Sequence, residues 1–142
     1  MNGKNFFMLK IRTMIVGADQ SGVSSTKTDD NRITPVGSFI RKFKIDELMQ
    51  LINILKGEMN FVGPRANTVE ATKKYSDEEV KLLKSLPGIT DLSSIIFSDE
   101  GSILEGSDDP DGDYDALIRP WKSRISIFYL SNRNNFFDIY II

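Results

Sequence analysis

Two adjacent carboxylates, Asp46 and Glu47, stand where an apolar helical pattern begins in the stretch KIDELMQLINILKG. The helix dipole favours acidic residues in a first helical turn by about 0.3–1 kcal/mol, which gives the pair an ordinary structural explanation. The pair also has a chemical explanation, because a carboxylate inside a phosphate site can attack phosphorus or hold Mg²⁺ against phosphate oxygens. The neighbouring residues bear on this choice.

Cations surround the acid pair in the sequence. Arg41, Lys42 and Lys44 come before it, and Arg65 comes after a Gly-Pro turn. Free backbone amides at a helix start and a ring of cations together form a site for phosphate. These neighbours favour the chemical explanation.

The 142-residue chain contains no cysteine and no histidine. Disulfides, thiolate metal sites and Ser-His-Asp or Cys-His catalysis are therefore excluded, which leaves carboxylates, lysine, tyrosine and hydroxyls as reactive groups. Residues 1–65 carry ten Lys and Arg against six Asp and Glu, whereas residues 66–142 carry eight against fourteen. The basic part favours an anionic ligand or surface, although an uneven solvated surface gives the same counts. The acidic part argues against nucleic acid as a partner.

Membrane and calcium motifs are also missing. No apolar run approaches the roughly 18–20 residues that cross a bilayer, and the first residues lack the apolar region of a signal peptide. The acidic stretch SDDPDGDYD resembles a calcium loop that begins at Asp109. However, its sixth position is Tyr114 and its twelfth is Pro120, where glycine and glutamate are required. A solvated loop is the better interpretation.

The pattern of apolar residues predicts one α/β domain (α+β-like) over residues 1–142, built from several amphipathic helices and short strands. We expect strands at 6–14, 59–62 and 93–97, and on the first of them Lys10 and Arg12 share a face. We expect helices at 35–43, 45–55, 76–86 and 116–130, with Thr34 as an N-cap and Ser76–Glu79 as a capping box. Mobile loops are predicted near 17–32 and 98–115.

Four motifs occur in order along the chain: NGKNFFMLKIRTM, DNRITPVGSFIRKFKIDELMQLINILKGEMNFVGPR, LPGIT and FYLSNRNNFFDIYII. They resemble the bacterial sugar transferases. These are small monotopic polyprenol-phosphate phosphoglycosyl transferases, which begin the assembly of surface glycans such as lipopolysaccharide and exopolysaccharide. The resemblance covers nearly the whole chain, and the block from Arg32 to Arg65 is its most specific part.

The resemblance implies that Asp46 and Glu47 are the catalytic pair. Asp46 would attack the β-phosphorus of a UDP-sugar, release UMP and pass the sugar phosphate to a polyprenol phosphate. Glu47 would be a Mg²⁺ ligand or a proton acceptor. The substrate-binding residues that the resemblance implies are Arg65, Lys10, Arg12, Arg41 and Asp138. Structural alternatives remain: a surface position for Arg65, a polar strand edge for Lys10 and Arg12, headgroup contact for Arg41, and an ion pair with Arg133 for Asp138.

Three residues depart from the family pattern. Met49 replaces the proline of DELPQ, Ala66 replaces the proline after GPR, and Asp91 replaces the glycine after PGIT. We expect the family's re-entrant N-terminal membrane helix to be absent, so that this chain is a soluble fragment, truncated at both ends, of an enzyme of the cytoplasmic face of the inner membrane. The basic, aromatic residues Phe39 to Lys44 would still contact a membrane surface. The alternative is a catalytically weak remnant that binds UDP-sugars or acts as a scaffold in a glycan-assembly complex.

Overall fold

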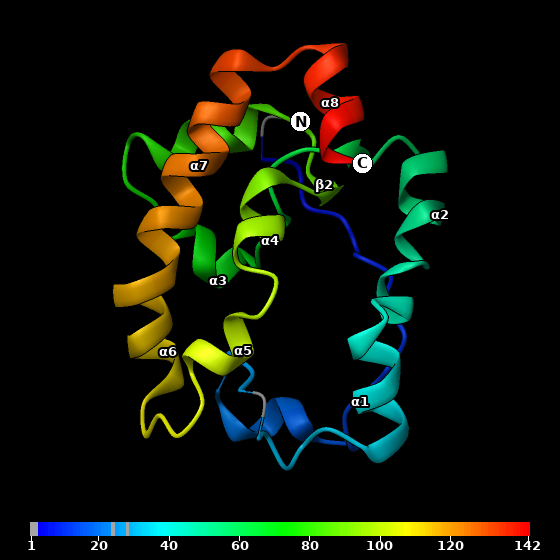
Figure 1. Ribbon diagram of the computed structural model, residues 1–142, viewed down its shortest axis with the longest axis vertical. Coiled ribbons are helices and arrows are strands. Elements are labelled where there is room, and N and C mark those ends of the chain that lie inside the picture. The colour runs from blue at the N-terminus through cyan, green and yellow to red at the C-terminus, as the bar shows by residue number, and fades with distance from the viewer. Residues whose placement is uncertain (1–2, 24, 28) are drawn as a thin grey trace.

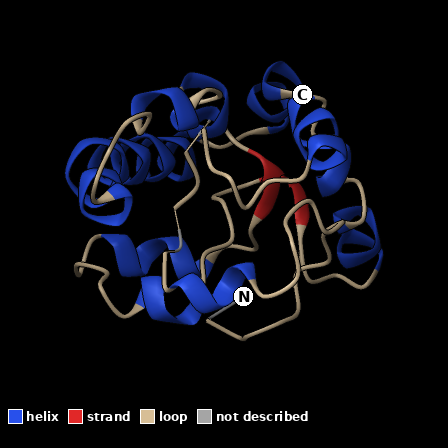
Figure 2. Cartoon of the chain, turned by 90° about the horizontal axis from the view of Figure 1, so that it is seen from below, coloured by secondary structure: helices blue, strands red, loops and turns tan. Residues whose placement is uncertain are grey.

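The computed structural model describes residues 3–142 except 24 and 28. Short helices surround two strands of three residues each (Figure 1), and Figure 2 shows the strands between groups of helices. In chain order the elements are η1 (Ala18–Ser21), α1 (Pro35–Lys42), η2 (Ile45–Glu47), α2 (Gln50–Leu55), β1 (Asn60–Val62), α3 (Val69–Thr72), η3 (Glu79–Lys84), β2 (Gly88–Thr90), α4 (Leu92–Ile96), α5 (Glu100–Ile103), α6 (Pro110–Asp113), η4 (Tyr114–Ile118), α7 (Arg119–Asn132) and α8 (Asn135–Ile141). The first three η elements are 3₁₀ helices, and η4 is a π-helical segment.

The strands β1 and β2 pair in parallel, with Asn60 opposite Gly88 and Val62 opposite Thr90. Directly after β1, Gly63 packs so closely on Gly88 that a Cβ on Gly88 would lie 2.2 Å from the Gly63 nitrogen. Two glycines are required here because no side chain fits between the two backbones. The pairing continues as a bridge between Arg65 and Gly88, which fixes the backbone of Arg65. The mixture of helices with short parallel strands agrees with the predicted fold class.

The main apolar core lies between the strand pair and the last two helices. Val62, Tyr129 and Ile141 are buried there. Leu92, Leu130 and Phe137 pack around them, so α4, α7 and α8 all contribute to this core. The strand pair that carries Arg65 is thereby supported from the C-terminal part of the chain.

The segment 6–14 is extended but does not form the predicted strand. Its one β-bridge is the isolated antiparallel bridge between Met14 and Ile33. Further along the segment, the Leu9 amide donates to Asn53 Oδ1 of α2 at 3.0 Å, and the Ile11 amide donates to the Asp46 carbonyl of η2 at 3.0 Å. The Thr13 carbonyl accepts from the Thr34 amide, just before α1, at 3.0 Å. The β-branched and aromatic content predicted the extended conformation correctly, but the partners are helical residues instead of a strand.

Two further predictions from sequence are wrong. The segment 93–97 lies largely in helix α4, because Asp91 caps that helix by accepting a hydrogen bond from the Ser94 amide. The predicted loop 98–115 contains α5 and α6, and Asp109 caps α6 in the same way through the Gly112 amide. Aspartate N-caps therefore determine the local structure where composition alone suggested a strand and a loop.

The helix predicted over 45–55 is divided into η2 and α2, and its buried side is polar. Asp46, Glu47, Gln50 and Asn53 are buried, whereas Leu48, Met49, Leu51, Ile52 and Leu55 are exposed. Figure 1 shows α1 and α2 along one side of the molecule and α7 along the other. None of the helices in the described part of the chain is long and apolar enough to cross a membrane.

Candidate active site

The acid pair lies in η2, immediately after a turn in the backbone. Lys44, which precedes η2, adopts the left-handed conformation with φ of 55°, an uncommon conformation for a residue with a side chain. Both acids are buried: 2% of Asp46 and 8% of Glu47 is exposed. The prediction that these acids occupy the first turn of a long helix is corrected, since α2 begins only at Gln50. Side chains, and not a long helix dipole, compensate their charges.

Lys10 is the first of these partners. Its Nζ lies 3.1 Å from Asp46 Oδ2 and 3.5 Å from Glu47 Oε1, so that one ammonium group bridges both carboxylates. The Lys10 side chain is 35% exposed, whereas that of Asp46 is only 3% exposed. Lys10 therefore covers the acid pair from the solvent side.

Arg65 is the second partner, and it comes from the end of the strand pair. Its Nη2 binds Glu47 Oε1 and its Nη1 lies 3.5 Å from Glu47 Oε2, which gives a two-pronged ion pair. Burial alone raises the pKa of Glu47, but the hydrogen bond and charge of Arg65, with the charges of Lys10 and Lys44, hold that pKa below its usual range. Glu47 is therefore ionised at neutral pH.

One oxygen of Asp46 makes no hydrogen bond to the described residues. Asp46 Oδ1 is the one buried side-chain oxygen or nitrogen, among residues 3–142 as described, that makes no hydrogen bond. An unsatisfied buried carboxylate oxygen is costly, and in native proteins it often marks a functional site or a missing ion or water. Asp46 Oδ1 thus keeps an unused hydrogen-bond acceptor, while the carboxylate is held through Oδ2 by Lys10.

The same carboxylates fit a divalent cation of the Mg²⁺ type. Within the described ranges no group of three or more acidic side chains gathers around one point. Mg²⁺ commonly uses one or two protein carboxylates and completes its shell with water and substrate phosphate. The Glu47 carboxylate, with substrate phosphate and water, would match that small donor set.

Asn53 supports the site and was not identified from the sequence. It is fully buried, and its amide group donates to the Phe7 carbonyl at 2.9 Å and to Glu58 Oε2 at 2.7 Å, while its oxygen accepts from the Leu9 amide. Asn53 therefore binds the backbone on the N-terminal side of Lys10. The available sequence signal was a polar residue inside a helix that otherwise appeared apolar.

The other three predicted binding residues do not contact the acid pair. Arg41 donates to Thr13 Oγ1 at 2.8 Å, and Arg12 is exposed without an ion pair to any described residue. Asp138 accepts from the Tyr129 hydroxyl at 2.5 Å and pairs with Arg133 at 3.3 Å, at the junction of α7 and α8. The ion pair between Asp138 and Arg133 is the one that the sequence analysis gave as the alternative to substrate binding.

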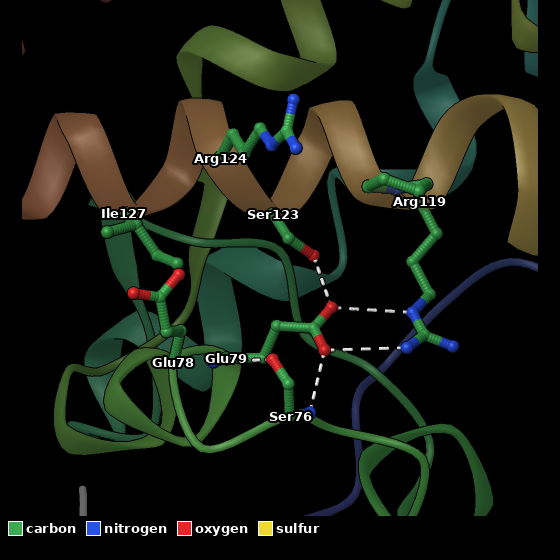
Figure 3. Close-up of a pocket in the computed structure, with 8 residues that line it drawn as sticks. Ser76, Glu78, Glu79, Arg119, Ser123, Arg124 and Ile127 are labelled. Atoms are coloured by element: carbon green, nitrogen blue, oxygen red, sulfur yellow. Dashed lines mark hydrogen bonds and ion pairs between the residues drawn. The ribbon is translucent and has the colours of Figure 1, made fainter.

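A cavity of about 210 Å³ lies beside α7, but its polar groups serve the fold (Figure 3). At its centre the Glu79 carboxylate accepts hydrogen bonds from the Ser123 hydroxyl at 2.6 Å, from the Ser76 amide at 2.8 Å and from Arg119. The predicted capping box is confirmed, since the Glu79 amide also donates to Ser76 Oγ. These groups leave Glu79 no spare hydrogen-bonding capacity for a ligand.

A second cavity of about 450 Å³ lies between the loops 15–32 and 107–110. Two hydrogen bonds cross this cavity. The Ser25 amide donates to Asp111 Oδ1 of α6 at 2.7 Å, and Lys27 Nζ donates to the Ser107 carbonyl at 3.1 Å. Arg32 in its wall is held by Asp30 and by backbone carbonyls. The cations of this cavity therefore also stabilise loops.

Comparison with known proteins shows similarity along the entire chain. The family model described as bacterial sugar transferase matches residues 1–142. The galactosyl transferase CpsE of Streptococcus agalactiae is 35% identical over 152 aligned residues, which include 99% of this chain and 30% of CpsE.

Two other relatives are named after their lipid substrate. The UDP-glucose:undecaprenyl-phosphate glucose-1-phosphate transferase of Caulobacter vibrioides is 37% identical over 67% of this chain and 37% of its own length. The undecaprenyl-phosphate galactose phosphotransferase of Salmonella typhimurium is 48% identical over 45% of this chain and 13% of its own length. This chain therefore spans less than half the length of each of these three relatives.

Proposed function

The chain belongs to the bacterial sugar transferase family, and from that premise we propose that it transfers a sugar 1-phosphate from a UDP-sugar to a polyprenol phosphate. The observation that carries the proposal is the unpartnered Oδ1 of Asp46, in a carboxylate that Lys10 holds through the other oxygen. The names of two relatives, which act on undecaprenyl phosphate, support the choice of acceptor.

In the proposed first step, Asp46 Oδ1 attacks the β-phosphorus of the UDP-sugar. A bond forms between Oδ1 and phosphorus, and the bond from that phosphorus to the bridging oxygen of the diphosphate breaks, so UMP leaves with the electron pair. The product is a sugar phosphate linked to Asp46 as an acyl phosphate. A covalent intermediate of this kind divides one difficult transfer into two easier steps.

Lys10 and Arg65 supply positive charge for this step. An anionic carboxylate and an anionic diphosphate repel each other, so cations must offset the charge that develops on the phosphoryl oxygens. Both cations are about one-third exposed and already contact the acids, which allows them to bind phosphate as it arrives. Mg²⁺ held by Glu47 would add further charge neutralisation when bound.

In the proposed second step, a phosphate oxygen of the polyprenol phosphate attacks the phosphorus of the intermediate. The bond between phosphorus and Asp46 breaks, the carboxylate is regenerated, and a polyprenol diphosphate sugar is formed. The lipid acceptor requires a membrane. Exposed apolar side chains lie on the elements before and after the acid pair: Val36 and Phe39 on α1, Phe43 directly after it, and Leu55 on α2. With Lys42 and Lys44 they fit the anionic cytoplasmic face of the inner membrane.

Intact-protein mass spectrometry tests the first step without a lipid acceptor. The protein is incubated with Mg²⁺ and each of several UDP-sugars, beside an Asp46→Asn variant and a Glu78→Gln variant as a matched control on an exposed acid. We expect an added mass of one sugar phosphate on the wild type and on Glu78→Gln but not on Asp46→Asn, with release of UMP.

The opposite result would favour the scaffold alternative. Binding of UDP-sugars, measured by calorimetry, without an adduct or UMP would remove the enzymatic proposal for this chain. An adduct that persists on Asp46→Asn would retain the transfer but assign the nucleophile to another residue.

A further inference from the structure

Arg65 is within electrostatic reach of acids on two sides. Burial alone lowers the pKa of its guanidinium, but the hydrogen bond and charge of Glu47, and then the charges of Glu100 and Asp91, raise that pKa above its usual value. Asp91 is buried and occupied by Ser93, Ser94 and Ser126. Glu100, the first residue of α5, is the accessible acid on this second side.

Glu100 is held through one of its two carboxylate oxygens. Lys122 of α7 donates from Nζ to Glu100 Oε2 at 2.7 Å, and its own side chain is only 12% exposed. Glu100 Oε1 accepts no hydrogen bond from the described residues, and the Glu100 side chain is 39% exposed. The carboxylate is therefore fixed in orientation and presents an open acceptor to the solvent.

Tyr114 completes this cluster from a third element. Lys122 Nζ lies 5.9 Å from the centre of its ring. Burial, and then the charge of Glu100, raise the pKa of Tyr114 to about 12, and Arg65 opposes that shift. Tyr114 is thus a neutral hydroxyl, and its ring and the Glu100 carboxylate both lie beside Lys122 Nζ. It begins a π-helical segment, a conformation that is frequent at functional sites.

We propose that Glu100, fixed by Lys122 and adjacent to Tyr114, binds hydroxyl groups of the sugar on the donor and determines which sugar is accepted. This inference rests on the proposed function, because it takes Arg65 to contact the donor diphosphate. The Glu100–Lys122 pair is neutral overall, so it does not attract phosphate. Glu100 Oε1 and the Tyr114 hydroxyl instead match the hydrogen-bond donors and acceptors of a sugar ring. A fixed carboxylate distinguishes epimers because only one of them directs a hydroxyl at it.

The ribose of UDP also carries two adjacent hydroxyl groups. The experiment must therefore distinguish binding of the ribose from binding of the donor sugar. Calorimetry in the presence of Mg²⁺ compares UDP, UDP-glucose and UDP-galactose on the wild type, Glu100→Gln, Tyr114→Phe and the control Glu105→Gln, which changes an exposed acid that makes no described ion pair. Rates of adduct formation are measured on the same proteins by mass.

We expect Glu100→Gln to change the ratio of the two UDP-sugar affinities by about tenfold, the effect of a hydrogen bond to a charged group. UDP affinity should stay unchanged, and Glu105→Gln should behave as the wild type. Tyr114→Phe, which removes a single oxygen, should change the same ratio. It tests the same cluster in a second variant if Glu100→Gln misfolds. An unchanged ratio in both variants, or an equal loss for UDP and both sugars, overturns the proposal. Failure of the transferase proposal gives a different result. The wild type then forms no adduct, while the ratio of the two UDP-sugar affinities can still be measured.

Discussion

Lys10 Nζ lies 3.1 Å from Asp46 Oδ2 and 3.5 Å from Glu47 Oε1, although Lys10 is 36 and 37 residues before these acids. The contact depends on an extended segment that is bound to α2 and η2 by its backbone. Together with Arg65 it places two cations over two nearly buried carboxylates. The site is therefore assembled from three separate parts of the chain, and each part can be tested.

Replacing Lys10 by methionine should slow adduct formation on Asp46 about 100-fold, because one preorganised cation is lost where phosphate charge develops. Lys10→Arg should recover part of the rate. Lys4→Met is the matched control, since Lys4 is exposed in the same segment. The measurement is the initial rate of mass increase with a saturating UDP-sugar, and a wild-type rate for Lys10→Met would exclude Lys10 from the reaction.

Asn53→Ala should lower the free energy of unfolding by about 3 kcal/mol, because the Leu9 amide, the Phe7 carbonyl and Glu58 all lose their hydrogen bonds to this fully buried side chain. The segment that carries Lys10 should then detach more readily, so adduct formation should also slow. Urea unfolding and the adduct rate measure the two effects. Asn5→Ala, at an exposed position of the same segment, should change neither quantity.

The sequence predicted the local features of the site better than its assembly. The Thr34 cap was confirmed, since Thr34 Oγ1 accepts from the Gly37 amide at 2.9 Å, and the short strand before Arg65 was confirmed as well. Both depend on neighbouring residues, whose effects are visible in a single sequence. The clustering of Lys10 and Arg65 at the acid pair depends on tertiary packing. The flanking cations in the sequence had suggested Arg65, but only the family resemblance suggested Lys10.

Polar burial explains what the sequence could not predict. Periodicity treats Leu48 and Leu51 as the inner face of a helix, but the structure exposes them and buries Gln50 and Asn53. An apolar face that is exposed toward a lipid surface and one that is packed in a core have the same pattern. The position of the acid pair on the buried side therefore became apparent only from the fold.

Gly37→Ala should lower the free energy of unfolding by about 3 kcal/mol. A Cβ at this position would lie 2.0 Å from the Thr13 carbonyl oxygen and 2.7 Å from Thr34 Oγ1, so that α1 would have to move away from the segment after Lys10. Thermal or urea unfolding measures the change. Ser38→Ala, one residue along the exposed side of α1, should be neutral or slightly stabilising, and equal effects of the two substitutions would contradict the steric explanation.

Glu79 should account for part of the loss of folding stability at low pH. Burial alone raises the pKa of Glu79, but the Ser123 hydroxyl, the Ser76 amide and Arg119 outweigh it and hold that pKa at about 2, against an ordinary value of 4.5. The folded pKa is depressed, so the unfolded chain binds a proton first as pH falls; the stabilisation is complete above pH 4.5 and is lost as pH falls toward 2. The free energy of unfolding of the wild type, measured in urea, should fall by about 2 kcal/mol over that interval because of this group.

Glu79→Gln should have a lower free energy of unfolding than the wild type at pH 7 and should lose less of it on acidification. Glu78→Gln, which changes an exposed neighbour in Figure 3, should follow the wild type. Parallel pH profiles for Glu79→Gln and the wild type would show that Glu79 does not carry this dependence.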